Sequence, residues 1–197
     1  MIVSDQQRDA LTELVNIGVG HAASTLNALI NHKIRLTVPE IEVIAVGDLH
    51  NRSTQQQDDH VSSVSMGFHG DLDGNASLIF PMDSASNLVA ALTGEAPDSE
   101  ALDELRSGTL AEVGNILLNG VMGSVSNMLS TNLNYTVPAY HEACIDQVVK
   151  YQKAEAVLIA RAHFYIDELR IEGNVLLFFE LESFNKLIDA VNQELAA

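Results

Sequence analysis

The chain has 197 residues and contains 10 Lys and Arg against 27 Asp and Glu, which gives a formal net charge of −17 with histidine neutral. Such an acidic protein is repelled by nucleic acid and by anionic membrane surfaces, so we expect neither as a partner. The single cysteine, Cys144, excludes an internal disulfide and suits a reducing compartment. Neither a secretory signal nor a bilayer-length apolar run is visible, so we expect a cytoplasmic protein.

In chain order, the elements expected in the first half are a helix at about 5–31, a strand at 33–46, a polar loop at 55–60, a hairpin of strands at 60–70 and 75–82, and a helix at 83–94. Ser4 and Gln7 form a capping-box pattern that begins the first helix. Pro39 is expected at a bulge or an edge of its strand. Asp83 and Gly94 suit the two ends of the last helix.

The second half is expected to follow a linker at 95–104, with a long helix at about 102–130, strands near 133–148, 154–167 and 171–181, and a terminal helix from about 183. Strands joined by a hairpin and flanked by helices predict an α+β fold, in which helices pack on an antiparallel sheet. The pattern is compatible with one continuous sheet and with two packed sheets.

An internal repeat is the strongest pattern in the sequence. Three residues recur 99 positions later: Glu13, Asn16 and Pro39 are matched by Glu112, Asn115 and Pro138. The same offset relates Gly74 to Gly173 and Phe80 to Phe179. This period is too long for a solenoid unit. We therefore interpret residues 1–197 as a single domain made of two repeats, about 1–96 and 97–197, related by a pseudo-two-fold axis.

The first long helix has two distinct faces at about 100° per residue. The apolar face contains Leu11, Leu14, Val15, Gly18, Ala22, Leu26 and Leu29, and the opposite arc contains Asp9, Glu13, Asn16, Gly20 and Asn27. The second long helix repeats the arrangement with Glu112 and Asn115. Each Glu-x-x-Asn pair is expected to project together from an exposed face. An ordinary solvated helix face is the alternative interpretation, with the glycines serving packing only.

The series Asp9-x3-Glu13-x2-Asn16-x22-Pro39 resembles the signature of the CheC/CheX/FliY family of chemotaxis phosphatases. The second copy retains its Glu, Asn and Pro but has Gly108 where the family has Asp or Ser. Two motif copies in a chain of this length are most similar to CheC. The resemblance implies a CheC-like fold with two long exposed helices.

The same resemblance implies a protein aspartyl-phosphate phosphatase that acts on a CheY-type response regulator in chemotaxis signalling. The regulator would hold Mg²⁺ itself, and this chain would need no cofactor, because placing a water in line with the phosphorus suffices. Asn16 and Asn115 would hold that water. Glu13 and Glu112 would pair with a lysine of the regulator. Supporting roles are implied for Asp9, Gly18, Gly20, Pro39 and Pro138.

Other interpretations stay open. The chain could be a non-catalytic CheC-like scaffold for a receiver domain or for CheD, or a structural domain with vestigial sites. Because Gly108 breaks the second motif, we expect the first site to be at least as active as the second. Two groups of candidate metal ligands remain. One loop contains His50, Asp58, Asp59 and His60, whose spacing matches no standard metal site. A predicted strand or its end contains His141, Glu142 and Cys144, and strand alternation sends neighbouring side chains to opposite faces, so we expect no metal site.

Overall fold

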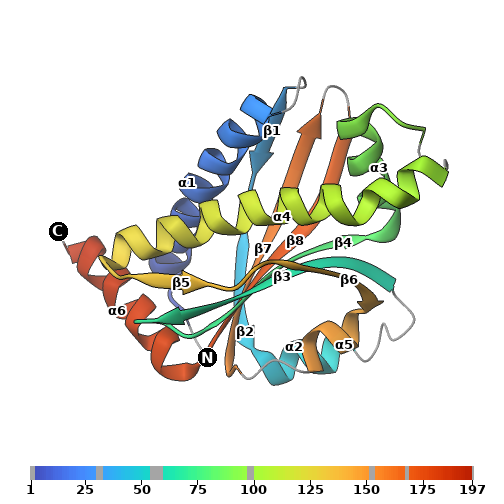
Figure 1. Ribbon diagram of the computed structural model, residues 1–197. Helices are drawn as coiled ribbons and strands as arrows, with labels where there is room; N and C mark the ends of the chain where they lie inside the picture. The colour runs from blue at the N-terminus through green and yellow to red at the C-terminus, as the bar shows by residue number, and fades with distance from the viewer. Residues whose placement is uncertain are drawn as a thin grey trace.

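The structure is a computed structural model that describes residues 3–29, 33–53, 60–96, 100–150, 154–166 and 169–196. Its elements in chain order are α1 (Asp5–Leu29), β1 (Ile34–Thr37), β2 (Ile41–Ala45), α2 (Val46–Ser53), β3 (His60–Gly70), β4 (Gly74–Pro81), α3 (Met82–Thr93), α4 (Glu100–Leu129), β5 (Leu133–Tyr135), β6 (Ala139–Cys144), α5 (Ile145–Lys150), β7 (Ala156–Ile166), β8 (Leu169–Phe179) and α6 (Leu181–Ala196) (Figure 1). The predicted α+β class is confirmed.

Within the described residues, all strands belong to one antiparallel sheet in the order β1-β7-β8-β4-β3-β5, with β2 also on β7 and β6 also on β3. The short strands of each half therefore pair with the hairpin of the other half. Neither half has a complete sheet of its own, and the path is symmetric about the β4–β8 pair. One domain made of two repeats stays our interpretation of this arrangement.

The 99-residue offset does not extend through every strand. Gly74 pairs with Phe68 in the first hairpin, whereas the matching Gly173 pairs with Ala162 in the second. The equivalent residues of β3 and β7 are thus 94 positions apart. The second hairpin is correspondingly longer, because its pairing continues to the tip at Ile166 and Leu169.

Several element boundaries differ from the predicted ones. The strand expected at 33–46 is divided into β1 and β2 around Pro39, and α4 begins at Glu100, inside the expected linker. Asp83 does not cap α3, whose N-cap is Pro81 with no side-chain hydrogen bond, while Gly94 ends it with a φ of 77° as predicted. The expected loop at 55–60 lies outside the described residues except for His60.

The short helices α2 and α5 were not predicted. They cover part of the sheet face opposite the long helices, where strand side chains form a second apolar cluster of Val61, Ile79, Val157, Leu176 and Phe178. Leu49 of α2 and Val148 of α5 pack against this cluster. With 8 and 6 residues, α2 and α5 are shorter than the window over which a helical period can be recognised in a sequence.

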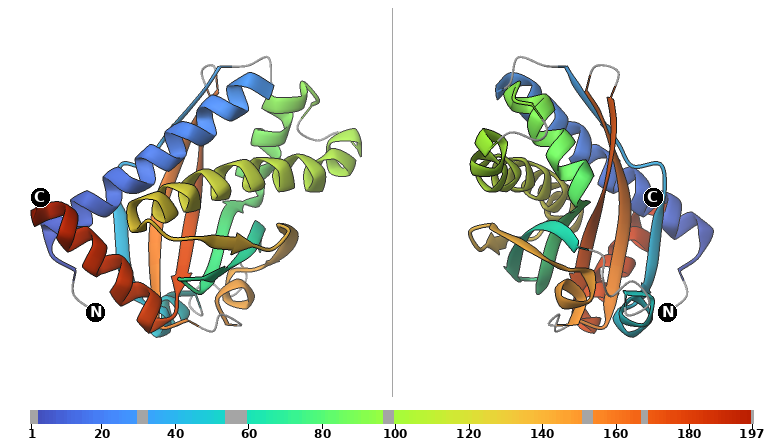
Figure 2. Two further views of the ribbon diagram at one scale, coloured as in Figure 1. Left: turned by 60° about the vertical axis from the view of Figure 1, so that its left-hand side comes forward. Right: turned by 90° about the vertical axis from the view of Figure 1, so that its right-hand side faces the viewer.

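The four longer helices, α1, α3, α4 and α6, lie against the other face of the sheet and enclose the main core (Figure 2). α1 and α4 make close contact at Gly18 and Gly120. A Cβ atom on Gly18 would lie 2.5 Å from the Cα of Val121, and one on Gly120 would lie 2.7 Å from the carbonyl oxygen of Gly18. The two backbones therefore touch. The close approach that Gly18 permits is therefore made by α4.

Candidate functional site

The start of α1 is held as the capping box predicts. The Gln7 N–H donates to Ser4 Oγ at 3.2 Å, and the Ser4 N–H donates to Gln7 Oε1 at 2.9 Å. The Gln7 amide also donates to Asn192 Oδ1 of α6 at 2.8 Å. These bonds fix the beginning of the helix that presents Glu13 and Asn16.

The two faces of α1 largely follow the prediction. Leu11, Leu14, Val15, Gly18, Ala22 and Leu26 are buried, and the Leu29 side chain lies outside the described residues. Asp9, Glu13 and Gly20 are exposed, and a Cβ atom on Gly20 would meet nothing within 4 Å. Asn16 differs, because it is half-buried rather than exposed.

The Asn16 carboxamide is bound to the segment in front of Pro39. Its Nδ2 donates to the carbonyl oxygens of Val38 at 2.7 Å and Thr12 at 3.0 Å, and its Oδ1 accepts the Val38 N–H at 2.9 Å. The orientation of the carboxamide is fixed, because the backbone N–H of Val38 requires an oxygen and its carbonyl requires a donor. Both amide hydrogens of Asn16 are therefore occupied.

Asn27 makes the same pair of bonds three helical turns later. Its Nδ2 donates to the Ile34 carbonyl oxygen at 2.8 Å, and its Oδ1 accepts the Ile34 N–H. β1 pairs with β7 on one side, and the two asparagines satisfy backbone groups at the first residue of β1, Ile34, and just after its end, at Val38. They protect a sheet edge that would otherwise be open to pairing. The repeated Asn at a spacing of 11 residues was the sequence signal for this role.

The second site has a different arrangement. Glu112 is exposed and Asn115 is half-buried. The Asn119 Nδ2 donates to Asn115 Oδ1 at 2.6 Å and to the Asn115 carbonyl oxygen at 2.8 Å. Among the residues that the structure describes, the Asn115 amide nitrogen has no hydrogen-bond acceptor. Its two hydrogens are therefore available to a bound group.

The segment before Pro138 lies on β3 instead of reaching Asn115. The Thr136 N–H donates to the Gly67 carbonyl oxygen at 3.0 Å, and the Gly67 N–H donates to Thr136 Oγ1 at 2.9 Å. Val137 is left 88% exposed, whereas the equivalent Val38 is 1% exposed. Pro138 is half-buried and Pro39 is exposed. The two copies of the motif thus have unlike surroundings.

A groove lies beside each glutamate. The groove beside Glu13 has a volume of about 490 Å³ and is lined by Ala10, Glu13, Leu14, Ile17, His21, Ser124, Asn127, Met128 and Glu194. The groove beside Glu112 has a volume of about 440 Å³ and is lined by Leu26, Leu92, Thr93, Glu104, Leu105, Gly108, Thr109, Glu112, Val113 and Ile116. His21, to which the sequence assigned no role, borders the first groove. Gly108 borders the second.

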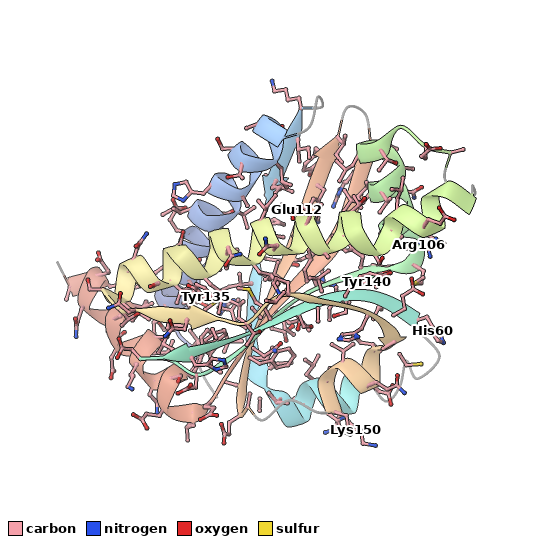
Figure 3. All side chains as sticks on the ribbon, viewed as in Figure 1. His60, Arg106, Glu112, Tyr135, Tyr140 and Lys150 are labelled. Carbon is pink, nitrogen blue, oxygen red and sulfur yellow. The ribbon has the colours of Figure 1, made fainter. Side chains whose placement is uncertain are left out.

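A polar cluster that the sequence did not indicate connects α4 to β6. The Tyr140 hydroxyl donates to Glu142 Oε1 at 2.6 Å and lies 3.2 Å from Ser62 Oγ, and Arg106 Nη1 is 3.5 Å from the same carboxylate. Burial, reinforced by the hydrogen bond to Glu142, raises the pKa of Tyr140 to about 12. In Figure 3, Tyr140 is on the β6 side of α4 and Glu112 on its other side. The cluster therefore braces the helix that carries the second site.

The metal candidates do not assemble in the part of the chain that is described. No group of three or more His, Cys, Asp or Glu side chains is placed to hold a metal ion among those residues. His60 Nε2 lies 3.7 Å from Cys144 Sγ across β3 and β6, and Asp58 and Asp59 are outside the described residues. None of the described helices is long and apolar enough to span a membrane.

Comparison with known proteins identifies the family. Residues 7–43 match the CheC-like family, and residues 62–159 match the chemotaxis phosphatase CheX. The CheY-P phosphatase CheC of Bacillus subtilis (strain 168) is 26% identical over 204 residues, which cover 98% of this chain and 97% of that protein. The chain belongs to the CheC/CheX/FliY family.

Other members of the CheC/CheX/FliY family match in part or in fold. The flagellar motor switch phosphatase FliY of B. subtilis (strain 168) is 25% identical over 138 residues, 69% of this chain and 35% of that protein. The X-ray structure of Thermotoga maritima FliY has a TM-score of 0.76 at 18% identity and covers 98% of this chain and 100% of that one. The CheX–CheY–BeF3–Mg²⁺ complex from Borrelia burgdorferi has a TM-score of 0.52 at 18% identity and covers 83% of this chain and 96% of that one. At these identities, the structures confirm the fold.

Proposed function

We propose that this protein is a phosphatase that accelerates hydrolysis of the aspartyl phosphate on a CheY-type receiver domain in chemotaxis signalling. The observation that carries the proposal is the pair on α4, where the Asn115 amide hydrogens have no acceptor in the described part of the chain and lie one turn from the exposed Glu112. The name of the B. subtilis relative, CheY-P phosphatase CheC, supports the substrate. The B. burgdorferi complex, which contains CheX, CheY and Mg²⁺, supports a receiver as the partner and the metal as part of that complex.

The proposed reaction needs only a few groups from this chain. A water attacks the phosphorus in line, the phosphorus–oxygen bond to the receiver aspartate breaks, and inorganic phosphate leaves a free carboxylate behind. An acyl phosphate is already activated, so the catalyst contributes positioning and electrostatics. Asn115 holds the water through a neutral carboxamide, which adds no negative charge beside the phosphoryl group. Glu112 pairs with a cationic side chain of the receiver and docks α4 at the phosphorylated aspartate.

We further propose that the second site carries most of the turnover, the reverse of the ranking expected from Gly108. Asn16 can bind a water with its amide hydrogens only after it releases Val38 or Thr12. Release from Val38 leaves backbone groups of a buried residue unpaired, which costs about 1–3 kcal/mol. Asn115 carries no such cost. Gly108 borders the groove beside Glu112 and lies about two helical turns before Asn115 on α4, too far along the helix to touch the Asn115 carboxamide.

A binding role is the second candidate for the first site. Glu13 is exposed beside its own groove, while the Asn16 carboxamide is occupied. That combination suits docking of a receiver without hydrolysis. CheD stays a prediction from the family resemblance.

The test is the decay of a phosphorylated receiver. Purified CheY-type receivers are phosphorylated with a small-molecule donor and Mg²⁺, and the loss of phosphate is followed with and without this protein. Faster decay that disappears in the Asn16→Ala/Asn115→Ala double variant supports the enzyme. Binding without faster decay supports the scaffold, and undiminished turnover by the double variant would end the carboxamide mechanism.

A further inference from the structure

Asn119 lies one helical turn after Asn115 on α4 and touches it twice. Its single amide nitrogen donates to the Asn115 side-chain oxygen at 2.6 Å and to the Asn115 carbonyl oxygen at 2.8 Å. An exposed asparagine on a helix is normally explained by solvation alone. Here, however, both hydrogens of the amide are spent on one residue, and that residue is the one proposed to hold the water.

These bonds determine which way the Asn115 carboxamide faces. The carbonyl oxygen of Asn115 can only accept, so Asn119 must present its nitrogen on that side. The neighbouring side-chain atom of Asn115 must then also be an acceptor, which is its oxygen. The Asn115 amide nitrogen is thereby turned away from Asn119, and it is the atom without an acceptor among the described residues. One lone pair of the Asn115 side-chain oxygen also stays available.

The first site has no counterpart to Asn119. The residue 99 positions earlier is Gly20, which is exposed and has open space around it. Asn16 is oriented by the backbone of Val38 instead. Each copy of the motif therefore has its own means of orienting the asparagine. The bonds to Val38 at the first site occupy the amide nitrogen of Asn16. The bond from Asn119 at the second site leaves the amide nitrogen of Asn115 available.

We propose that Asn119 is a positioning residue for the phosphatase reaction at the second site. It holds the Asn115 side-chain oxygen so that the amide nitrogen faces the position of the attacking water. This inference rests on the proposed function and assigns a part of the site that the Glu-x-x-Asn motif does not contain. Asn119 itself touches neither the water nor the receiver.

The experiment uses the full chain with Glu13→Ala as the parent, so that the second site is measured alone. Asn119→Ala should lower kcat for receiver dephosphorylation by about five- to tenfold, the scale of one lost hydrogen bond, with KM within about twofold of the parent. Asn119→Gln keeps a donor that can reach back one turn, so it should recover at least about half of the lost rate. Ser107→Ala, an exposed polar-to-alanine change on the same helix, serves as the control for α4.

A measurement that needs no turnover accompanies the kinetics. In ¹H–¹⁵N spectra of the unbound protein, the side-chain amide signals of Asn115 should shift in Asn119→Ala and keep their positions in Ser107→Ala. Alanine is a better helix former than asparagine, so the variant should unfold at the same or a higher urea concentration. A drop in kcat would then reflect orientation rather than stability.

An active parent with unchanged kcat in Asn119→Ala overturns this inference and leaves the proposed function intact. Asn115 amide signals that do not move overturn it as well. If Glu13→Ala is inactive while the unaltered protein is active, turnover belongs to the first site, and both our ranking of the sites and the positioning role fail. If the unaltered protein is inactive as well, the proposed function fails.

Discussion

Val38 and Val137 precede the two matching prolines, yet 1% of Val38 is exposed and 88% of Val137. Val38 is held under α1 by Asn16, whereas the segment of Val137 is held on β3 through Thr136. The Glu-x-x-Asn pair and the proline that both copies share thus occur in two arrangements. Both amide hydrogens of the asparagine are bound in the first copy, and in the second copy only its oxygen is bound, among the described residues. Four predictions follow from this difference and from its surroundings.

Stability should separate the two asparagines. Asn16→Ala leaves the N–H and carbonyl of the buried Val38 unpaired, so we expect the free energy of unfolding to fall by about 1–3 kcal/mol. Asn115→Ala removes only a contact with Asn119 on the helix surface and should change stability by less than about 0.5 kcal/mol. Urea unfolding monitored by circular dichroism measures both, and equal losses in the two variants would contradict the assignment.

For activity, the larger loss is expected at Asn115 rather than at Asn16. Asn115→Ala should remove at least about nine-tenths of the receiver dephosphorylation, because about 1.4 kcal/mol of lost transition-state stabilisation already lowers a rate tenfold. Asn16→Ala should retain most of it, assayed at a temperature where the variant is folded. Phosphate release from a phosphorylated receiver is the measurement. A larger loss in Asn16→Ala would reverse our ranking of the sites.

Two glycines of α1 should respond differently to alanine. Gly18→Ala places a Cβ atom against the α4 backbone, 2.5 Å from the Cα of Val121, and should destabilise the protein by about 1–3 kcal/mol or more. Gly20→Ala enters open space and should stabilise it by about 0.5–1 kcal/mol, because alanine is the better helix former. Thermal unfolding of the two variants is compared with that of the parent; a tolerated Gly18→Ala would mean that the helices can separate there.

Alkaline pH should weaken the brace between α4 and β6. The Tyr140 hydroxyl has its pKa raised to about 12, whereas a tyrosine in the unfolded chain ionises near pH 10. The contribution of this hydroxyl to the free energy of unfolding is therefore fully present below about pH 10 and is lost as the pH rises toward 12. The stability difference between the parent and Tyr140→Phe should be constant from about pH 7 to 9 and should narrow above about pH 10. Urea midpoints across this range test the sign, and a widening difference would refute it.

Short-range patterns predicted much of the fold. The capping box at Ser4, the apolar face of α1 and the β3–β4 hairpin each depend on residues close in sequence, and each is present in the structure. The failures involve distant partners. α2 and α5 are placed by an apolar cluster drawn from four strands, and the short strands pair with the hairpin of the opposite half.

The candidate site shows the same limit in more detail. A helical projection places Asn16 opposite the buried face, but it contains no information about Val38, which is 22 residues away and arrives through β1. The motif gives both asparagines the same role, because it records residue types and spacing rather than hydrogen bonds. The position that distinguishes the copies, Asn119 against Gly20, lies outside the signature. Motif matching alone therefore ranks the two sites by Gly108, which lies about two helical turns from Asn115.

The exchange of short strands has a consequence for biosynthesis. β1 pairs with β7, so the pairing of Ile34 with Ile166 cannot form until Ile166 has left the ribosome. Pairing over such a long stretch of chain is slow, and an unpaired strand edge is prone to aggregation in the meantime. The asparagines of α1 can form their bonds to β1 as soon as that strand has emerged, since Asn27 and Ile34 are only seven residues apart. These bonds hold β1 against α1 before its partner strand β7 has been synthesised.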